Sequence, residues 1–171
     1  MQNFKLVKIR DYKKGRNLRE RTLLFLVQGD KVLLGQKKSG FGKGKILGIG
    51  GKIDGNETPE QTTIRESMEE INAVPVEIQK VAVVNFYFPY VEEPDRWEQK
   101  VHVFLAKEWQ GEIKETDEIL PLWFKIGNIP FDEMWPDAKY WLPKVLSNEK
   151  IEGHFIYNDK IEIYDFILKN L

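Results

Sequence analysis

The sequence contains no cysteine among its 171 residues. This absence excludes disulfide bonds and thiolate metal sites, and it fits a protein of a reducing compartment. The chain also lacks any run of about 18 apolar residues, the length that a membrane-spanning helix needs. Its start, MQNFKLVKIRDYKK, has no uninterrupted apolar core of the kind found in signal peptides. We therefore expect a cytoplasmic protein without a membrane partner.

The residues that are present fit one enzyme domain. A chain of 171 residues is about the length of a single domain, and 42% hydrophobic with 12% aromatic residues can fill a substantial core. There is no internal repeat, low-complexity segment or flexible linker. We expect a single functional domain and a monomer.

Positive charge is concentrated at the start of the chain. Residues 1–21 hold eight Lys or Arg and two acidic residues, a net +6, which leaves −7 for the rest of a chain whose net charge is −1. We interpret residues 1–20 as a basic N-terminal extension, either an added edge strand or a solvated leader. Nucleic-acid contact is the alternative, but Phe4, Leu6 and Ile9 lack the aromatic interleaving of a strand-stacking surface, and the acidic remainder disfavours binding to a phosphate backbone. We expect no nucleic-acid polymer as the main partner.

Apolar and β-branched runs predict a sheet, and two segments predict helices. The predicted strands are TLLFLVQ (22–28) and KVLLGQK (31–37) as a hairpin around Gly29-Asp30, then 79–91, 100–108 and 121–126, and finally GHFIYN (153–158) and KIEIYDFIL (160–168) as a second hairpin. One helix is predicted to begin near residue 59, and a shorter one, which Pro143 kinks or delays, over 139–147. This order predicts an α/β fold in which helices enclose a mixed sheet.

The first predicted helix carries signals at both ends. Thr58 can cap its amino end, Pro59 suits the first helical position, and Gln61 completes a capping box. Asn72 tolerates the left-handed conformation that closes helices, and Pro75 resists continuation. A helix of about thirteen residues follows from these signals.

The same helix has an acidic side and an apolar side. At helical spacing, three carboxylates gather on one face, and three apolar side chains, predicted to form the core face, lie almost opposite. The acidic set is Glu66, Glu69 and Glu70, and the apolar set is Ile64, Met68 and Ile71. A solvated acidic face is the alternative, since like charges at i, i+4 cost only about 0.2–0.5 kcal/mol per pair.

A glycine-rich loop before the helix favours a binding site. Gly48, Gly50 and Gly51 let the main chain approach closely and could turn a carbonyl toward the glutamates. Hard oxygen ligands of this kind suit magnesium or manganese.

A specific spacing links the loop and the helix to a known family. The spacing is G-x5-E-x7-R-E-x2-E-E, formed by Gly51, Glu57, Arg65, Glu66, Glu69 and Glu70. With it the chain resembles the Nudix hydrolases. The departures at Ser67, Asn72 and Ala73 remove no implied metal ligand.

The resemblance extends from about Arg21 to about Leu168 and is closest to the MutT-type group that hydrolyses oxidised purine nucleoside triphosphates. The stretches that carry it are VLLGQKKSGFGKGK, VHVFLA, WFKIGNIPFDEMWPD and YWLP. It implies that residues 21–171 form a Nudix hydrolase domain, an α/β/α sandwich with a mixed sheet and a loop-helix-loop box.

The resemblance also implies a metal site, with Mg²⁺ as cofactor and Mn²⁺ as the alternative. Glu69 and Glu70 would bind metal with the carbonyl of Gly50, and Glu66 would act as a ligand or a base. A further carboxylate, Glu118, comes from the loop before Pro121, although from sequence alone it reads as a surface charge. Arg65 and Glu57 would pair to orient the cluster. The implied catalytic residues are Glu57, Arg65, Glu66, Glu69 and Glu70, and the implied metal ligands are Gly50, Glu66, Glu69, Glu70 and Glu118.

The nucleotide would be held by aromatic and polar side chains. Aromatic faces suit a planar base, an acidic side chain beside an indole can read the donor edge of a purine, and a lysine would approach the sugar and phosphates. The implied substrate-binding residues are Lys37, Phe41, Leu47, Phe86, Trp135 and Asp137. Judged alone, each aromatic residue is more typical of a core position than of a pocket wall, and Lys37 is equally compatible with a solvated strand end.

Two departures from the MutT-type group affect the expected specificity. Leu47 stands where the group has asparagine, and Ala138 stands where it has a second aspartate; Gln99 also changes one pocket wall. A site that loses polar contacts to the base discriminates less by hydrogen bonding.

The leading hypothesis is magnesium-dependent hydrolysis of a purine nucleoside triphosphate, including an oxidised one such as 8-oxo-dGTP, to the monophosphate and pyrophosphate. The first alternative is a Nudix hydrolase of another diphosphate derivative, such as a dinucleotide or a 5′ RNA end. The second alternative is a non-catalytic nucleotide-binding regulator. A lost box carboxylate would favour that hypothesis, and none is lost.

Overall fold

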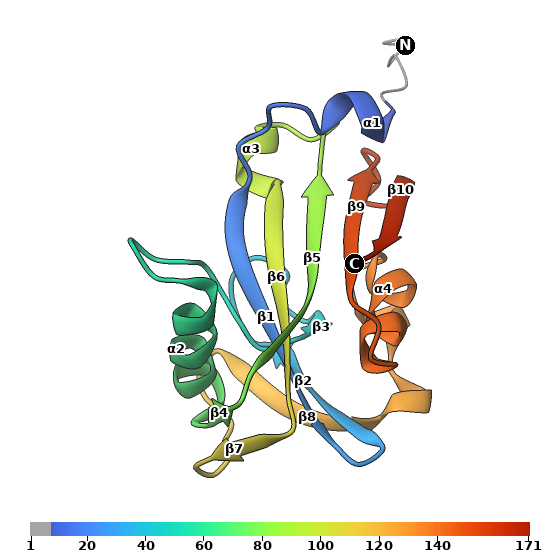
Figure 1. Ribbon diagram of the computed structural model, residues 1–171. Coiled ribbons are helices and arrows are strands. Elements are labelled where there is room, and N and C mark those ends of the chain that lie inside the picture. The colour runs from blue at the N-terminus through green and yellow to red at the C-terminus, as the bar shows by residue number, and fades with distance from the viewer. Residues whose placement is uncertain (1–7) are drawn as a thin grey trace.

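The computed structural model describes residues 8–171, so Phe4 and Leu6 of the basic extension lie outside the described residues. Figure 1 shows a tall sheet with helices beside it. The strands are β1 (Arg19–Gln28), β2 (Lys31–Lys37), β3 (Ile46–Leu47), β4 (Val74–Val76), β5 (Gln79–Tyr87), β6 (Gln99–Ala106), β7 (Glu108–Gln110), β8 (Ile119–Lys125), β9 (Ile151–Tyr157) and β10 (Ile163–Asn170). The α-helices are α1 (Ile9–Tyr12), α2 (Pro59–Ile71), α3 (Pro94–Trp97) and α4 (Ala138–Leu146), and short 3-10 turns cover Ile126–Asn128 and Phe131–Glu133.

The main sheet is mixed, as the sequence predicted. Its strands follow the order β10-β9-β5-β6-β1-β2-β3, and β8 pairs with β2. The pairs β1/β6 and β5/β9 are parallel, whereas the other pairs of this sheet are antiparallel. Strands β4 and β7 form a separate two-stranded sheet.

Both predicted hairpins are confirmed. The first places Val27 opposite Val32 around the Gly29-Asp30 turn. In the second, β9 and β10 pair across a loop in which the side chain of Asn158 accepts hydrogen bonds from two backbone N–H groups. Strand β5 ends at Tyr87 rather than at the predicted residue 91, because Pro89 has no N–H group to continue a ladder.

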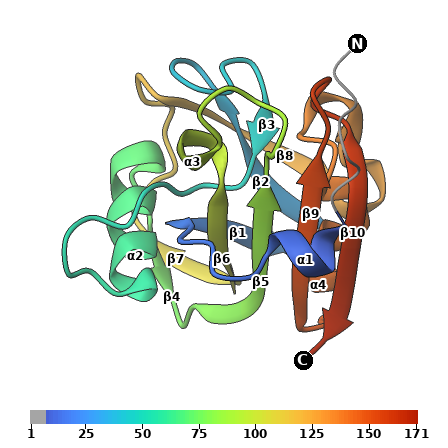
Figure 2. The same ribbon diagram turned by 90° about the horizontal axis from the view of Figure 1, so that it is seen from above.

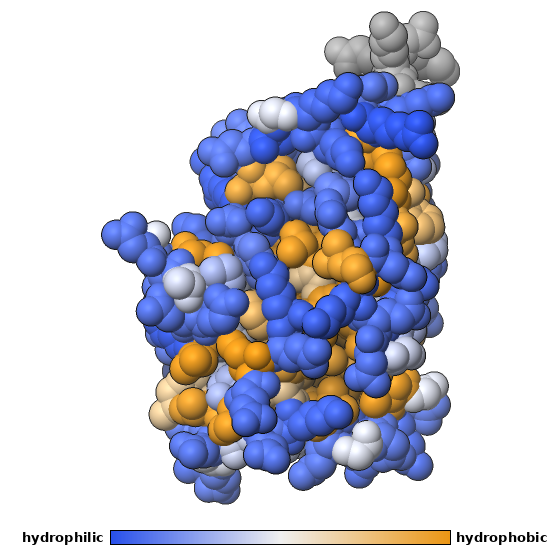
Figure 3. Space-filling model, in the orientation of Figure 1, coloured by the Kyte–Doolittle hydropathy of each residue, from blue (hydrophilic) through white to orange (hydrophobic). Residues whose placement is uncertain are grey.

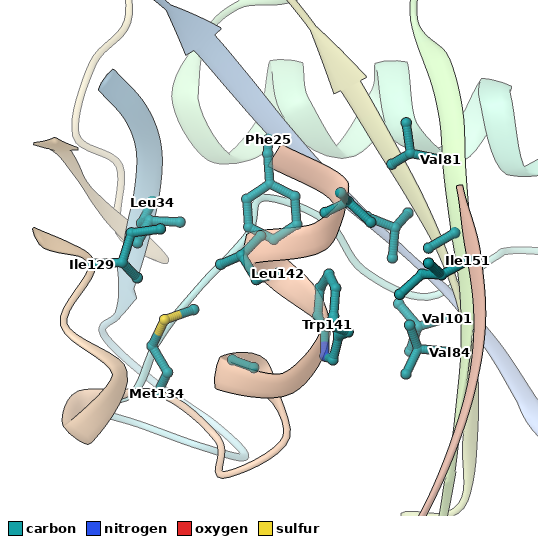
Figure 4. Close-up of a cluster of buried hydrophobic side chains, with 14 of the residues drawn as sticks. Phe25, Leu34, Val81, Val84, Val101, Ile129, Met134, Trp141, Leu142 and Ile151 are labelled. Atoms are coloured by element: carbon teal, nitrogen blue, oxygen red, sulfur yellow. The ribbon is translucent and has the colours of Figure 1, made fainter. Parts of the chain in front are cut away.

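The sheet packs helices on both faces, so the predicted α/β/α arrangement is confirmed. Alternating side chains of a strand point to opposite faces: Leu24 of β1 packs in one core with Ile71 of α2, whereas Phe25 packs in the other with Trp141 of α4. Figure 4 shows Trp141 and its neighbours from α4 beside Phe25, and Figures 1 and 2 show α2 and α4 at different sides of the molecule. Helices α2 and α4 thus cover opposite faces of the sheet.

The described part of the basic extension is a short helix that docks on the sheet. Ile9 is buried and clusters with Tyr87 and Ile156, and the guanidinium of Arg16 lies 2.6 Å from the carboxylate of buried Glu98. Over residues 8–18 the chain is therefore neither the added strand nor the solvated leader that we predicted. The division of the chain at residue 20 stays a prediction.

The face of the molecule seen in Figure 1 is largely polar. Figure 3 shows hydrophobic residues only in scattered patches on the face seen in Figure 1. Across residues 8–171, none of the helices combines the length and the apolar character that crossing a membrane requires.

Candidate active site

Helix α2 begins and ends where the sequence predicted. The hydroxyl of Thr58 accepts from the N–H of Gln61, whose side chain accepts in turn from the N–H of Thr58, so the capping box is complete. Pro59 is the first helical residue, and Asn72 closes the helix in the left-handed conformation with φ of 59°. These local signals fix the helix to within a residue.

The face that α2 turns to the sheet is not the predicted one. Ile64 and Met68 are 40% and 49% exposed, whereas Thr63 and Ser67 are buried beside Ile71. The hydroxyl of Ser67 donates to the carbonyl of Ala73 at 2.7 Å, and that of Thr63 donates to a carbonyl of its own helix. Because both hydroxyls form hydrogen bonds, their burial leaves no polar group without a partner. The assignment of Ile64 and Met68 to the core was wrong.

The glutamates consequently point toward the sheet and the glycine loop. Glu70 is 6% exposed and accepts a hydrogen bond from the N–H of Gly50 at 3.0 Å. The side chain of Glu66 is 12% exposed, and a Cβ atom added to Gly51 would come within 2.3 Å of its carboxylate. The third glutamate, Glu69, is exposed. The loop glycines therefore allow the main chain to lie directly against two carboxylates, as predicted from their spacing.

Arg65 holds three acidic side chains together. It forms a bidentate pair with Glu57, with N–O distances of 2.7 and 2.9 Å, and its third guanidinium nitrogen bonds Glu66 at 3.0 Å and Glu69 at 3.2 Å. These hydrogen bonds, together with one from the hydroxyl of Thr62, lower the pKa of Glu57 to about 2. The predicted pairing of Arg65 with Glu57 is present, in a fork geometry that fixes the guanidinium plane.

The buried carboxylates repel one another. Burial raises the pKa of Glu70 to about 8; the Gly50 N–H opposes this rise, and the negative charges of Glu66 and Glu118 add to it. Burial also raises the pKa of Glu66. Three carboxylates that influence one another in this way share one region of space, although only two of them lie on α2.

Glu118 reaches this region from the loop before β8. Its backbone carbonyl accepts from the N–H of Lys38, and the neighbouring Thr116 donates its hydroxyl to the carbonyl of Glu70 at 2.8 Å. The 116–118 loop is thus tied to the end of α2, which brings an exposed carboxylate that sequence alone suggested to be a surface charge near the box glutamates.

The donor groups at this place fit a hard divalent cation. As the side chains stand in residues 8–171, no three His, Cys, Asp or Glu residues surround one point, because Arg65 and the N–H of Gly50 hold the box carboxylates. The available ligands are nevertheless all oxygen, which Mg²⁺ and Mn²⁺ prefer. Burial is the main cause of the raised pKa of Glu70, and a cation would offset the repulsion from Glu66 and Glu118 that adds to it. The metal-binding roles of Gly50, Glu66, Glu69, Glu70 and Glu118 stay predictions.

A pocket adjoins the carboxylates and continues to the aromatic side chains that the sequence indicated. All six predicted substrate-binding residues line it, and so do Gly50 and Gly51 of the box loop. The six are Lys37, Phe41, Leu47, Phe86, Trp135 and Asp137. The departures Ala138 and Gln99 also line this pocket.

One wall of the pocket is a stack of aromatic rings. Phe41 lies parallel to Trp135 with ring centroids 5.5 Å apart and an interplanar angle of 17°, and Trp97 of α3 contacts Phe41 edge-on at 4.7 Å. Phe41 is 48% exposed. An exposed ring that stacks at the rim of a pocket is suited to contact a planar ligand.

Asp137 lies at the inner end of the pocket with both oxygens engaged. It accepts from the indole N–H of Trp141 at 2.7 Å and from the hydroxyl of Tyr157. Burial raises its pKa to about 6, while these two hydrogen bonds oppose the rise. The carboxyl is fixed by α4 and β9, and its predicted contact with a base stays a prediction.

The sequence analysis missed Arg21 and Tyr157, which also line the pocket. Arg21 could have been found from the period of two along β1, because Leu23 and Phe25 on the same face line the pocket too. Tyr157 carries no such signal, since its partner Asp137 is 20 residues distant in the chain.

Comparison with known proteins gives the same picture. The NUDIX domain model matches residues 17–145. The oxidized purine nucleoside triphosphate hydrolase of Mus musculus is 38% identical over 150 residues, covering 88% of this chain and 94% of its own, and the protein of that name from Danio rerio is 39% identical over 149 residues, covering 87% and 90%. In three dimensions the mutator MutT protein of Bacillus halodurans superposes with a TM-score of 0.73 at 24% identity, over 89% of this chain and 98% of its own.

Nudix hydrolases generally use divalent metal ions, which agrees with the oxygen donors found here. The family model spans most of the chain, and the two relatives match nearly all of it. The chain therefore belongs to the Nudix hydrolase family.

Proposed function

We propose that this Nudix hydrolase converts purine nucleoside triphosphates, oxidised purines such as 8-oxo-dGTP included, to the nucleoside monophosphate and pyrophosphate, with Mg²⁺ or Mn²⁺ as cofactor. One observation carries the proposal: the pocket is continuous from the stacked rings of Phe41 and Trp135 to the Gly50–Gly51 loop that touches the box glutamates. A base held at the rings would direct its phosphates toward those carboxylates. The two similar animal proteins are named for the same activity.

In this proposal the residues of the chain bind the metal ion, orient the catalytic carboxylate and take a proton from the attacking water. Glu69, Glu70, Glu118 and the carbonyl of Gly50 would hold the divalent cation, which would neutralise phosphate charge and acidify water. Glu66 serves either as another ligand or as the base that takes a proton from the attacking water, and burial makes its carboxylate more basic. Arg65 positions Glu66 through its fork with Glu57.

The reaction joins the oxygen of water to the β-phosphorus and breaks the bond from that phosphorus to the oxygen bridging it to the α-phosphorus. The monophosphate leaves with the bridging oxygen and accepts a proton, and the water oxygen ends in pyrophosphate. Cations already bound at the site would stabilise the negative charge that accumulates on the phosphates in the transition state.

A substrate panel in ¹⁸O-labelled water tests the proposal. The wild-type protein with Mg²⁺ is offered dGTP, 8-oxo-dGTP, ADP-ribose, a dinucleotide and a 5′-triphosphorylated RNA, and the products are weighed by mass spectrometry. We expect monophosphate and ¹⁸O-labelled pyrophosphate from the purine triphosphates. Turnover confined to ADP-ribose, the dinucleotide or RNA would contradict the proposal, and label in the monophosphate would contradict attack at the β-phosphorus.

A further inference from the structure

Arg21, near the start of β1, lines the pocket. In β1 its side chain shares a face with Leu23 and Phe25, and its neighbour across the parallel pair is Val101; all four residues line the pocket. The backbone of Arg21 forms a bridge with Lys52, directly after the glycine loop. The residue is thus held at the end of the pocket nearest to the box.

The guanidinium has no partner in the described part of the chain. Its Nε atom is buried without a hydrogen bond, and residues 8–171 give the Arg21 side chain no ion pair and no ring to stack on. Burial lowers its pKa, an effect that the positive charge of Arg19 reinforces. The side chain as a whole is half-buried, and a partly buried cation without a partner is costly, so such a group usually has an anionic partner.

The nearest charges show where that partner would lie. Lys37 is close enough for Arg21 to lower its pKa, after the larger effect of burial, whereas the negative charges of Glu70 and Glu118 raise it. Within residues 8–171, no ion pair forms at Lys37. Glu66 also acts on Arg21, but Arg65 already binds that carboxylate at 3.0 Å. Two cations therefore line one pocket between the aromatic wall and the box, and no carboxylate of residues 8–171 forms an ion pair with either.

We propose that Arg21 binds the phosphate that is attached to the nucleoside, beside Lys37, whose place near the phosphates the family resemblance already implies, and that the Arg21 contact makes the pocket select nucleotides over nucleosides. The inference rests on the proposed function and adds a binding residue to it. A phosphate matches the fork of donors on a guanidinium, whereas a lysine supplies only a point charge. The base is a poorer partner for Arg21, since the rings of the aromatic wall make no cation–π contact with it in residues 8–171.

The test compares a monophosphate with its nucleoside. Binding of 8-oxo-dGMP and of 8-oxo-deoxyguanosine is measured by calorimetry in EDTA, so that neither metal nor turnover contributes. For Arg21→Met we expect about a tenfold to hundredfold loss of affinity for the monophosphate, the range for a charged hydrogen bond, and no more than a twofold change for the nucleoside. Arg21→Lys, which keeps the charge, should lose less.

Arg19→Met is the matched control, because Arg19 lies on the same face of β1 but is exposed and does not line the pocket. It should leave both affinities unchanged. An equal loss for nucleoside and monophosphate in Arg21→Met, or no loss for either, would overturn the inference. If the wild type hydrolyses the triphosphate in such a case, the proposed function stands alone; if the wild type binds neither compound and hydrolyses no triphosphate, both proposals fall.

Discussion

The N–H of Gly50 donates to the carboxylate of Glu70 at 3.0 Å, and this bond joins the glycine loop to the most buried acid of helix α2. No side chain fits at Gly50, since an added Cβ would lie 2.0 Å from the carbonyl oxygen of Thr22. Loop, strand and helix are packed closely here, and within residues 8–171 this backbone amide is the only hydrogen-bond donor to the carboxylate of Glu70. The glutamate is held in place before any ligand binds.

Glu70→Gln should abolish most activity without unfolding the protein. The pKa of about 8 means that Glu70 is largely protonated at pH 7 in the metal-free protein, so a neutral amide of the same shape resembles the resting state, and its oxygen can still accept from Gly50. Bound metal, in contrast, requires the charge. We expect kcat to fall by orders of magnitude at saturating Mg²⁺ and the melting temperature at pH 7 to stay within a few degrees.

The comparison variant for that prediction is Glu60→Gln, at an exposed position in the first turn of the same helix. It should keep wild-type kcat. A Glu70→Gln enzyme with near-normal kcat would remove Glu70 from the metal site.

Substitutions on α2 should follow the observed faces and not the hydropathy of the side chains. Ile64→Gln and Met68→Gln change exposed residues, and each should alter the free energy of unfolding by less than about 0.5 kcal/mol. Ser67→Leu inserts a larger side chain at a fully buried site and removes the hydrogen bond to Ala73. We expect it to cost about 1–3 kcal/mol in urea denaturation. A large loss of stability in Ile64→Gln, with none in Ser67→Leu, would show that the face predicted from hydropathy is the buried one.

The two faces of α2 show what the sequence could predict and why. The capping box, Asn72 and the glycine loop act within a few residues, so their sequence signals were sufficient. The buried face depended on contacts that spacing does not reveal: Ser67 donates to a carbonyl beyond the helix end, and Glu70 accepts from a loop 20 residues earlier. A hydropathy pattern treats these polar groups as exposed because it cannot count their distant partners.

The sequence likewise predicted some residues of the pocket and not others. Lys37, Phe41 and Trp135 were placed in the pocket because family resemblance carries tertiary information. The unpaired state of Arg21 and the bond from Tyr157 to Asp137 arise from side chains that meet only in the folded sheet. The alternation along β1 could have placed Arg21 in the pocket, but no local pattern shows that its side chain is unpaired or that Tyr157 bonds Asp137.

Asp137 should make stability depend on pH between about 4 and 6. Its pKa is raised from 3.8 in an unfolded chain to about 6 by burial, so in this window the folded state binds more protons than the unfolded state. The contribution of Asp137 to the free energy of unfolding therefore falls as pH rises through the window, by about 1.4 kcal/mol per pKa unit of difference, and levels off above pH 6. Glu70, whose pKa burial raises to about 8, adds a fall of its own that continues to higher pH. Asp137→Asn cannot titrate and should lose the part of the slope that Asp137 contributes.

The measurement is urea denaturation of the wild type and of Asp137→Asn at several pH values from 4 to 7. Asp132→Asn, at an exposed aspartate five residues earlier, is the control and should keep the slope of the wild type. Identical slopes for the wild type and Asp137→Asn would show that the buried carboxyl does not titrate in this range.

Leu47→Asn combined with Ala138→Asp should shift preference toward 8-oxo-dGTP. Both residues line the pocket, and the new side chains would restore hydrogen-bonding groups that a base must match. Position 138 opens helix α4, where a negative charge is stabilised by the helix dipole. Beside Asp137, whose pKa is already raised to about 6, a second carboxyl would share a proton with the first, so that one could donate and the other accept.

A base that leaves buried groups unpaired loses about 1–3 kcal/mol, so the ratio of kcat/KM for 8-oxo-dGTP over dGTP should rise about tenfold. Leu47→Met with Ala138→Ser, which changes shape at both positions but adds no charge, controls for the volume of the pocket. If the double variant keeps the wild-type ratio, the base does not bind between Leu47 and Ala138, and the pocket assigned to it must receive another part of the substrate.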